Sequence, residues 1–264
     1  MHSRRKRKII IGIILFIEAI AFITSTLWVF RGRVLNDVKV EKSRTATIFI
    51  PGYGGNAVST DDFINQFNDH GIAKRSLRIY ISNDGKVSTM KKYVKKIKKD
   101  NPLVQLIFQD NTHPEKQADQ MVNVMSYLHD KYKIKSVNFL GHSSGGTIAY
   151  EYMVKHPHQK NAPEANKFVS IANDYDPNDK RVKNLPRTLH VLNIAGEIYN
   201  VGTDGEEAVN IVKPMGKLVK PYVKSYQFYL YRADPLSAEH SMLHENPSLD
   251  KTIAEFLFNK HPKL

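Results

Sequence analysis

The stretch Val137-Asn138-Phe139-Leu140-Gly141-His142-Ser143-Ser144-Gly145-Gly146 places a serine between an apolar run and a pair of glycines. The apolar residues predict a buried strand, and a helix is expected to begin at Gly145. A serine at such a corner projects its hydroxyl above the edge of a sheet, and glycines two residues away on either side leave room for the turn. The stretch therefore predicts a nucleophile elbow centred on Ser143. The alternative is an ordinary turn before a helix.

Segments on both sides of the elbow alternate between strand and helix patterns. Strands are predicted at residues 45–50, 77–82, 103–108, 136–140, 168–172, 189–194 and 226–231, and helices at 62–70, 117–132, 145–156 and 249–259. Such alternation implies a mainly parallel central sheet with helices on both faces. The predicted class is α/β, in one domain over residues 45–264.

A serine nucleophile needs a base and an acid, which in this setting follow it in the order Ser, Asp or Glu, His. His240 lies in a loop after the last predicted strand, and we assign it as the base. Asp204 lies in the loop after the preceding strand, and we assign it as the carboxylate that orients His240. His244 is the alternative base, and Asp174 and Glu197 are alternative acids.

The same chemistry needs hydrogen-bond donors for an oxyanion. The run Pro51-Gly52-Tyr53-Gly54-Gly55 follows the first strand of the domain, where one donor is expected. The backbone N–H groups of Tyr53 and Ser144 are the predicted pair. The alternative is a flexible glycine loop without a catalytic role.

One acidic segment, residues 174–179, has part of the pattern of a calcium-binding loop. It lacks the glycine and the final glutamate of an EF-hand. We therefore predict neither a metal site nor a cofactor.

Composition narrows the class of protein. The chain has 264 residues, of which 41% are hydrophobic and 25% charged, as in an ordinary globular domain. It has no cysteine, which excludes disulfides, thiolate metal sites and a cysteine nucleophile. The net charge of +13 suits an anionic neighbour, and the lysines between Lys91 and Lys99 would contact anionic lipid or a cell-wall polymer. No nucleic-acid-binding motif is present, so nucleic acid is not expected as a partner. The alternative for the lysines is a solvated face.

The N-terminus predicts a membrane anchor. Residues 9–30 form a nearly unbroken apolar run, which as a helix spans roughly 33 Å and so exceeds the ~30 Å hydrocarbon core. The basic residues Arg4 to Lys8 precede the run, so residues 1–8 are expected in the cytoplasm and the rest of the chain outside. Residues 31–44 are predicted to form a stalk. The alternative is a cleaved signal peptide that releases a secreted form.

Several motifs taken together resemble a family of α/β-hydrolases exported by low-GC Gram-positive bacteria, described as cell-surface hydrolases. They are Pro51-Gly52-Tyr53-Gly54-Gly55, Asn101-Pro102, Phe108-Gln109-Asp110-Asn111, the elbow stretch to Gly146, Leu192-Asn193-Ile194-Ala195-Gly196, Thr203-Asp204-Gly205 and His240-Ser241-Met242-Leu243-His244-Glu245-Asn246. The resemblance implies a triad of Ser143, Asp204 and His240. Two positions depart from the family pattern: Pro51 replaces the usual histidine, and Glu206-Glu207-Ala208-Val209 replaces a hydrophobic-serine stretch.

These observations predict a single-pass membrane protein whose outer domain hydrolyses carboxylic esters through an acyl-enzyme on Ser143. The substrate is expected to be a small-molecule or lipid-like ester. The alternatives are a thioesterase, acyltransferase or peptidase on the same fold, or a catalytically silent surface-binding module.

Overall fold

The structure is a computed structural model that describes residues 2–259. Met1, in the predicted flank 1–8, lies outside the described residues. So do residues 260–264, at the end of the predicted domain 45–264.

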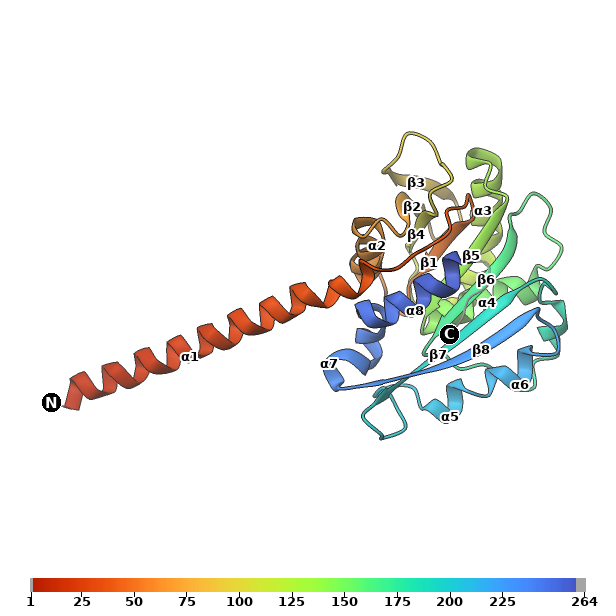
Figure 1. The fold of residues 1–264 in the computed structure, drawn as a ribbon. Helices are drawn as coiled ribbons and strands as arrows, with labels where there is room; N and C mark the ends of the chain where they lie inside the picture. The colour runs from red at the N-terminus through yellow and green to blue at the C-terminus, as the bar shows by residue number, and fades with distance from the viewer. Residues whose placement is uncertain (1, 260–264) are drawn as a thin grey trace.

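The domain is built on an eight-stranded sheet with the order β3-β2-β4-β1-β5-β6-β7-β8 (Figure 1). The strands are β1 (Ala46–Ile50), β2 (Lys74–Ile81), β3 (Val87–Lys92), β4 (Pro102–Phe108), β5 (Ser136–His142), β6 (Glu164–Ile171), β7 (His190–Ile198) and β8 (Ser225–Ala233). All neighbouring pairs are parallel except β2 and β3, which form an antiparallel hairpin. The predicted α/β class with a mainly parallel sheet is confirmed.

Helices cover both faces of the sheet. The α-helices are α1 (His2–Arg31), α2 (Val58–Asp69), α3 (Pro114–Tyr132), α4 (Ser144–Lys155), α5 (Val209–Val212), α6 (Met215–Val219), α7 (Pro235–Ala238) and α8 (Pro247–Phe258). The short 3-10 helices are η1 (Gly32–Leu35), η2 (Lys180–Asn184) and η3 (His240–His244).

Two hydrophobic cores lie on the two sides of the sheet. One contains buried side chains of α3 and α4 with one face of the strands, including Met121, Ile148 and Phe139. The other contains side chains of α2 and α8 with the opposite face, and there the rings of Phe67 and Phe258 meet edge to face at 5.8 Å. Because both faces are buried, the central strands consist of apolar runs rather than alternating patterns, which is why they could be read from the sequence.

The N-terminal helix α1 projects away from the domain (Figure 1). Its segment Arg7–Thr26 is long and apolar enough to cross a membrane, and no part of that segment is buried against the described domain. A helix with this composition serves as a membrane anchor or as a signal sequence.

The segment 31–44 differs from the predicted stalk, because it packs on the domain. Residues 32–35 form η1, and Leu35 is fully buried among side chains that include those of α8. Val38 and Val40 pack against the same core. Its polar, mixed-charge composition suggested a short stalk, but these apolar side chains pack it against the core that includes α8.

Candidate active site

The carboxyl ends of the parallel strands β1, β5, β6, β7 and β8 meet at one edge of the sheet, and the predicted site residues follow them. The strand register shows that these strands end at the same level of the sheet. Ile50 at the end of β1 pairs with Gly141, and Ile171 at the end of β6 pairs with His142. The loops that carry the predicted nucleophile, acid, base and oxyanion donors therefore begin from a common edge.

Ser143 occupies the corner between β5 and α4. Its backbone has φ 52° and ψ −133°, which is a strained conformation for a residue with a side chain. Its N–H donates to the carbonyl oxygen of Ile171 at 2.8 Å, which holds the corner against β6. This is the geometry expected of a nucleophile elbow.

The two glycines of the elbow are required by close backbone approach. A Cβ on Gly141 would lie 2.3 Å from the backbone C and O atoms of Gly145, and a Cβ on Gly145 would lie 2.3 Å from the carbonyl oxygen of Ile50. Helix α4 therefore begins in direct contact with β1 and β5.

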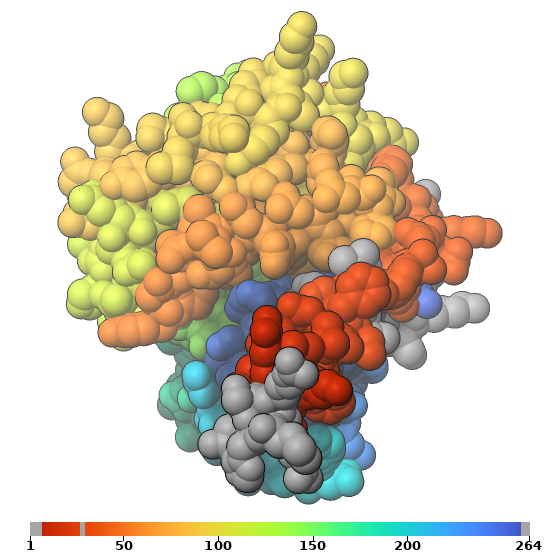
Figure 2. Space-filling view, turned by 90° about the vertical axis from the view of Figure 1, so that its left-hand side faces the viewer, coloured from red at the N-terminus to blue at the C-terminus, as the bar shows by residue number. Residues whose placement is uncertain are grey.

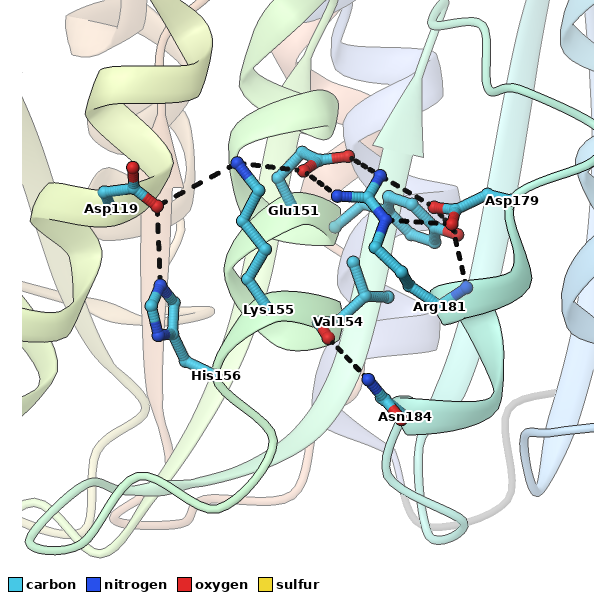
Figure 3. Close-up of polar contacts among 9 residues, drawn as sticks. Asp119, Glu151, Val154, Lys155, His156, Asp179, Arg181 and Asn184 are labelled. Carbon is cyan, nitrogen blue, oxygen red and sulfur yellow. Dashed lines mark hydrogen bonds and ion pairs between the residues drawn. The ribbon is translucent and has the colours of Figure 1, made fainter.

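Polar contacts hold the rest of α4 in place (Figure 3). Arg181 of η2 forms a fork with both carboxylate oxygens of Glu151, at 2.8 and 2.6 Å. Its guanidinium also binds Asp179, whose carboxylate accepts the hydroxyl of Tyr150. Lys155 bridges Glu151 at 3.2 Å and Asp119 of α3 at 3.9 Å. The helix behind the elbow is thereby tied to both of its neighbours.

Asp204 and His240 are brought together by the loops after β7 and β8. The Nδ1–H of His240 donates to Oδ2 of Asp204 at 2.9 Å, and both side chains are buried. The backbone N–H of His240 also donates to the carbonyl oxygen of Asp204, at 3.0 Å. The other carboxylate oxygen, Oδ1, accepts from the N–H groups of Glu206 and Glu207 at 3.0 and 2.7 Å. These contacts orient the imidazole and leave Nε2 as the ring nitrogen that can accept a proton.

The charge around His240 favours its protonated form. Burial opposes the charged ring, but the hydrogen bond and charge of Asp204 outweigh it, with smaller contributions from Glu206 and Glu207, so the pKa of His240 is raised. Glu206 is mostly exposed, and its Oε2 lies 3.5 Å from Nε2 of His240. Glu206 was given no role from the sequence, where positions 206–209 were noted only as a departure from the family pattern.

His142 links the elbow to the loop that carries the base. Its Nε2–H donates to the carbonyl oxygen of His240 at 2.9 Å, and its ring centroid lies 4.6 Å from the rings of both His240 and His244. Burial, with the nearby rings of His244 and His240, holds the pKa of His142 well below its usual value, so this ring is neutral. The immediate neighbour of Ser143 thus contacts the predicted base. This contact was not predicted from the sequence, in which His142 appears only as a variable position of the elbow motif.

The alternative base, His244, and the alternative acids, Asp174 and Glu197, have different surroundings from His240 and Asp204. Burial lowers the pKa of His244 to about 4, and the carboxylate of Asp204 binds His240 instead. Asp174 is exposed. Glu197 binds Arg232 at 2.5 Å and accepts the N–H of Gly202 at 2.9 Å, so it fastens the turn that leads to Asp204.

The candidate oxyanion donors come from the loop after β1 and from the first residue of α4. A Cβ on Gly52 would lie 3.3 Å from Cβ of Ser143, which places the loop containing Tyr53 against the nucleophile corner. The N–H of Gly54 donates to the carbonyl oxygen of Asn111 at 2.7 Å, which fixes this loop. Ser144 is the first residue of α4, so its N–H is among those that lack a partner within the helix.

Within residues 2–259 no group of three or more His, Asp or Glu side chains could hold a metal ion. In the segment with part of a calcium-loop pattern, Asp176 accepts the N–H of Asn178, and Asp179 binds Arg181.

Comparisons with known proteins agree with this fold. Residues 36–184 and 178–260 match a family model described as alpha/beta hydrolase of unknown function (DUF915). No curated protein matches the chain.

Solved structures give the same fold. A Listeria innocua protein is 25% identical, with a TM-score of 0.72 over 83% of this chain and 95% of its own. A presumed cell surface hydrolase from Lactobacillus plantarum is 20% identical, with a TM-score of 0.65 over 81% of this chain and 89% of its own. A thermostable carboxyl esterase from Bacillus coagulans is 11% identical, with a TM-score of 0.50 over 83% of this chain and 91% of its own. The last two likenesses bear on the fold alone.

Proposed function

Because the chain belongs to the family of α/β-hydrolases of unknown function whose model it matches, we propose that it is a serine hydrolase of carboxylic esters. In this proposal Ser143 is the nucleophile, His240 the base and Asp204 the residue that orients the base. The observation that carries the proposal is the buried 2.9 Å hydrogen bond between His240 and Asp204, at the sheet edge where residue 143 forms a strained strand-to-helix corner.

The proposed reaction has two halves. The Oγ of Ser143 attacks the ester carbonyl carbon while Nε2 of His240 accepts its proton, and the N–H groups of Tyr53 and Ser144 stabilise the oxyanion. The C–O bond to the alcohol then breaks, and the alcohol leaves with the proton from His240. Water, deprotonated by His240, attacks the acyl-enzyme and releases the carboxylic acid. One water is consumed for each ester cleaved.

The position of Glu206 leads to a prediction about pH dependence. His240 accepts a proton only when it is neutral, so activity is lost as the pH falls through its raised pKa. Removing the negative charge beside Nε2 with Glu206→Gln lowers that pKa. We therefore expect the acid limb of the kcat/KM profile for a soluble ester to move to lower pH. Glu115→Gln, on the exposed start of α3, is the control and should leave the profile in place. An acid limb that stays in place or moves to higher pH in Glu206→Gln contradicts this role for Glu206.

The proposed location is the outer face of a membrane. Helix α1 would span the bilayer, with the basic residues Arg4 to Lys8 on the cytoplasmic side and the hydrolase domain outside. The span is supported by the apolar segment Arg7–Thr26, no part of which is buried in the domain, and the orientation rests on the basic flank.

The experiment that tests the proposed activity is a substrate panel with the full chain in detergent. We expect hydrolysis of p-nitrophenyl esters of graded acyl length, and lower rates on thioesters and on peptide amides of matched acyl groups. Preference for a thioester or an amide would replace the ester assignment by one of the other acyl-transfer activities. A folded chain that hydrolyses none of them, and that a fluorophosphonate does not label, would indicate a silent binding module.

A further inference from the structure

Helix α1 leaves the domain at the edge of the sheet that carries the candidate site. The guanidinium of Arg31, its last residue, donates to Oγ of Ser237 at 3.0 Å. Ser237 lies on α7, which follows the carboxyl end of β8 and directly precedes the loop of His240. In Figure 1, β8 runs toward α7 on the side from which α1 departs.

The connection between α1 and the domain is short and fixed. Residue 32 begins η1 directly after α1 ends, and Leu35 is already fully buried in the domain. The guanidinium of Arg33 lies 3.9 Å from the ring centroid of Phe30, and this contact packs the two helices together. A bilayer that surrounds α1 must therefore end close to the surface of the domain.

Exposed apolar side chains lie on the loops and on the first turns of the helices at this same edge. We call them the apolar rim: Tyr53, Val58, Tyr199, Val201 and Leu236, with exposures between 58% and 77%. The first two follow the carboxyl end of β1, the next two that of β7, and the last that of β8. Outside α1, only Met90 and Ile211 among the described residues are other large apolar side chains of comparable exposure. A cluster of this kind on a soluble surface marks a contact with a partner or a membrane.

The occupant of this edge is indicated by α1 itself. A view along the direction of α1 shows that helix nearly end on, with α2 (orange) above it and blue residues near the C-terminus behind it (Figure 2). The yellow part of the chain, which includes residues 91–99, fills the top of the same view. We call residues 91–99 the basic segment, and its lysines are exposed. These lysines lie at the opposite edge from the rim, whereas the apolar rim shares its edge with the anchor and suits insertion in a bilayer surface.

We propose that the carboxyl edge of the sheet rests on the outer leaflet, with the apolar rim inserted in it, and that the site takes its ester from that same bilayer. The substrate class is then an acyl ester of a membrane lipid, cleaved to a carboxylic acid and a lipid alcohol with one water consumed. This inference rests on the proposed function and on α1 as the anchor. The basic segment lies at the opposite edge and takes no part in this contact, because β3 runs antiparallel to β2 and Lys92 pairs with Leu77 rather than with Ile81 at the carboxyl end.

The absence of cysteine allows the docking to be measured directly. Single-cysteine variants Leu236→Cys and Val201→Cys are labelled with an environment-sensitive fluorophore and reconstituted, as full chains, in vesicles of phosphatidylcholine and phosphatidylglycerol. Both labels should shift to the blue and be quenched by nitroxides on the lipid acyl chains. Lys160→Cys, in the exposed turn after α4 at the opposite edge, is the matched control and should stay water-exposed. The docking would be overturned if the labels at residues 201 and 236 were as exposed to water as the label at residue 160.

A label at Lys96→Cys is a second control. The basic segment leads from β3 to the amino end of β4 at Pro102, on the edge opposite the rim, so this label should stay in water. Quenching of this label by lipid nitroxides, with the labels at residues 201 and 236 left in water, would contradict docking through the carboxyl edge.

The substrate class is tested with a rim variant that carries Val58→Ser, Val201→Ser and Leu236→Ser. We expect it to hydrolyse a soluble p-nitrophenyl ester within about twofold of wild type, but a fluorogenic diacyl lipid in the same vesicles about tenfold more slowly, because three apolar contacts with the bilayer are lost. Equal retention of both activities overturns the role of the rim. A wild type that cleaves the soluble ester and leaves the lipid intact overturns the substrate class alone. A wild type that cleaves neither overturns the proposed function, while the fluorescence still reports the docking.

Discussion

Ser143→Ala is expected to lower kcat/KM for a p-nitrophenyl ester by about 10⁴- to 10⁶-fold, the loss typical of removing a serine nucleophile. The hydroxyl is the only group lost, and the elbow retains its backbone hydrogen bond to Ile171. Alanine also fits the corner as well as serine does, because both carry a Cβ at φ 52°. The fold should therefore persist, and the change in rate should report the chemistry.

The measurement is steady-state hydrolysis by the full chain, with circular dichroism and thermal unfolding to establish that the variant is folded. Ser88→Ala, on the exposed edge strand β3, is the matched control and should keep the wild-type rate. A folded Ser143→Ala variant that retains more than about a tenth of the activity would exclude Ser143 as the nucleophile, since even partial triads lose far more.

Asp204→Asn is expected to lower kcat by about 10⁴-fold while leaving the loop folded. The asparagine oxygen can still accept the N–H groups of Glu206 and Glu207, as Oδ1 of Asp204 does. Its NH₂ group would then face Nδ1 of His240 in place of the present acceptor. The imidazole would adopt the tautomer with its proton on Nε2, and in that form it cannot accept the proton of Ser143.

The control for this prediction is the rival acid. Asp174→Asn changes an exposed carboxylate after β6 and should alter kcat by less than about threefold, as surface substitutions away from a site do. Measuring kcat and KM for both variants separates the two assignments. A large loss in Asp174→Asn with a small one in Asp204→Asn would transfer the role of the acid to Asp174.

The fold was readable from the sequence because the central strands are buried on both faces. Their apolar runs, alternating with helix patterns, predicted the α/β class with a mainly parallel sheet. The resemblance of several motifs implied the α/β-hydrolase family, which the family model shows. Asp204 and His240 were predicted to act together from their positions after neighbouring strands. Their 2.9 Å hydrogen bond fits that prediction, and the catalytic roles remain proposals.

Other features were missed for identifiable physical reasons. Strand β3 was not predicted, because at this exposed edge its lysines point to water and their charges obscure the strand pattern of Val87 to Lys92. A helix was predicted over residues 62–70, but α2 begins at Val58, whose backbone N–H donates to the side-chain oxygen of Asn56. The contact of Glu206 with His240 depends on the conformation of a loop, and sequence spacing does not determine that conformation.

The packing of residues 31–44 was also missed, although a signal was present. Val34, Leu35, Val38 and Val40 are apolar residues within a charged segment, and all four contact the core that includes α8. Composition averaged over the segment concealed them.

The central claim is that the hydroxyl of Ser143 is activated by His240. Its most direct test is reaction of the full chain with a fluorophosphonate, followed by mass spectrometry of the intact protein and its peptides. We expect a single phosphonyl adduct on Ser143 in wild type, formed more slowly by about 10³-fold or more in a folded His240→Ala variant. An adduct on another residue, no adduct on folded wild type, or equal labelling of wild type and His240→Ala would contradict this claim.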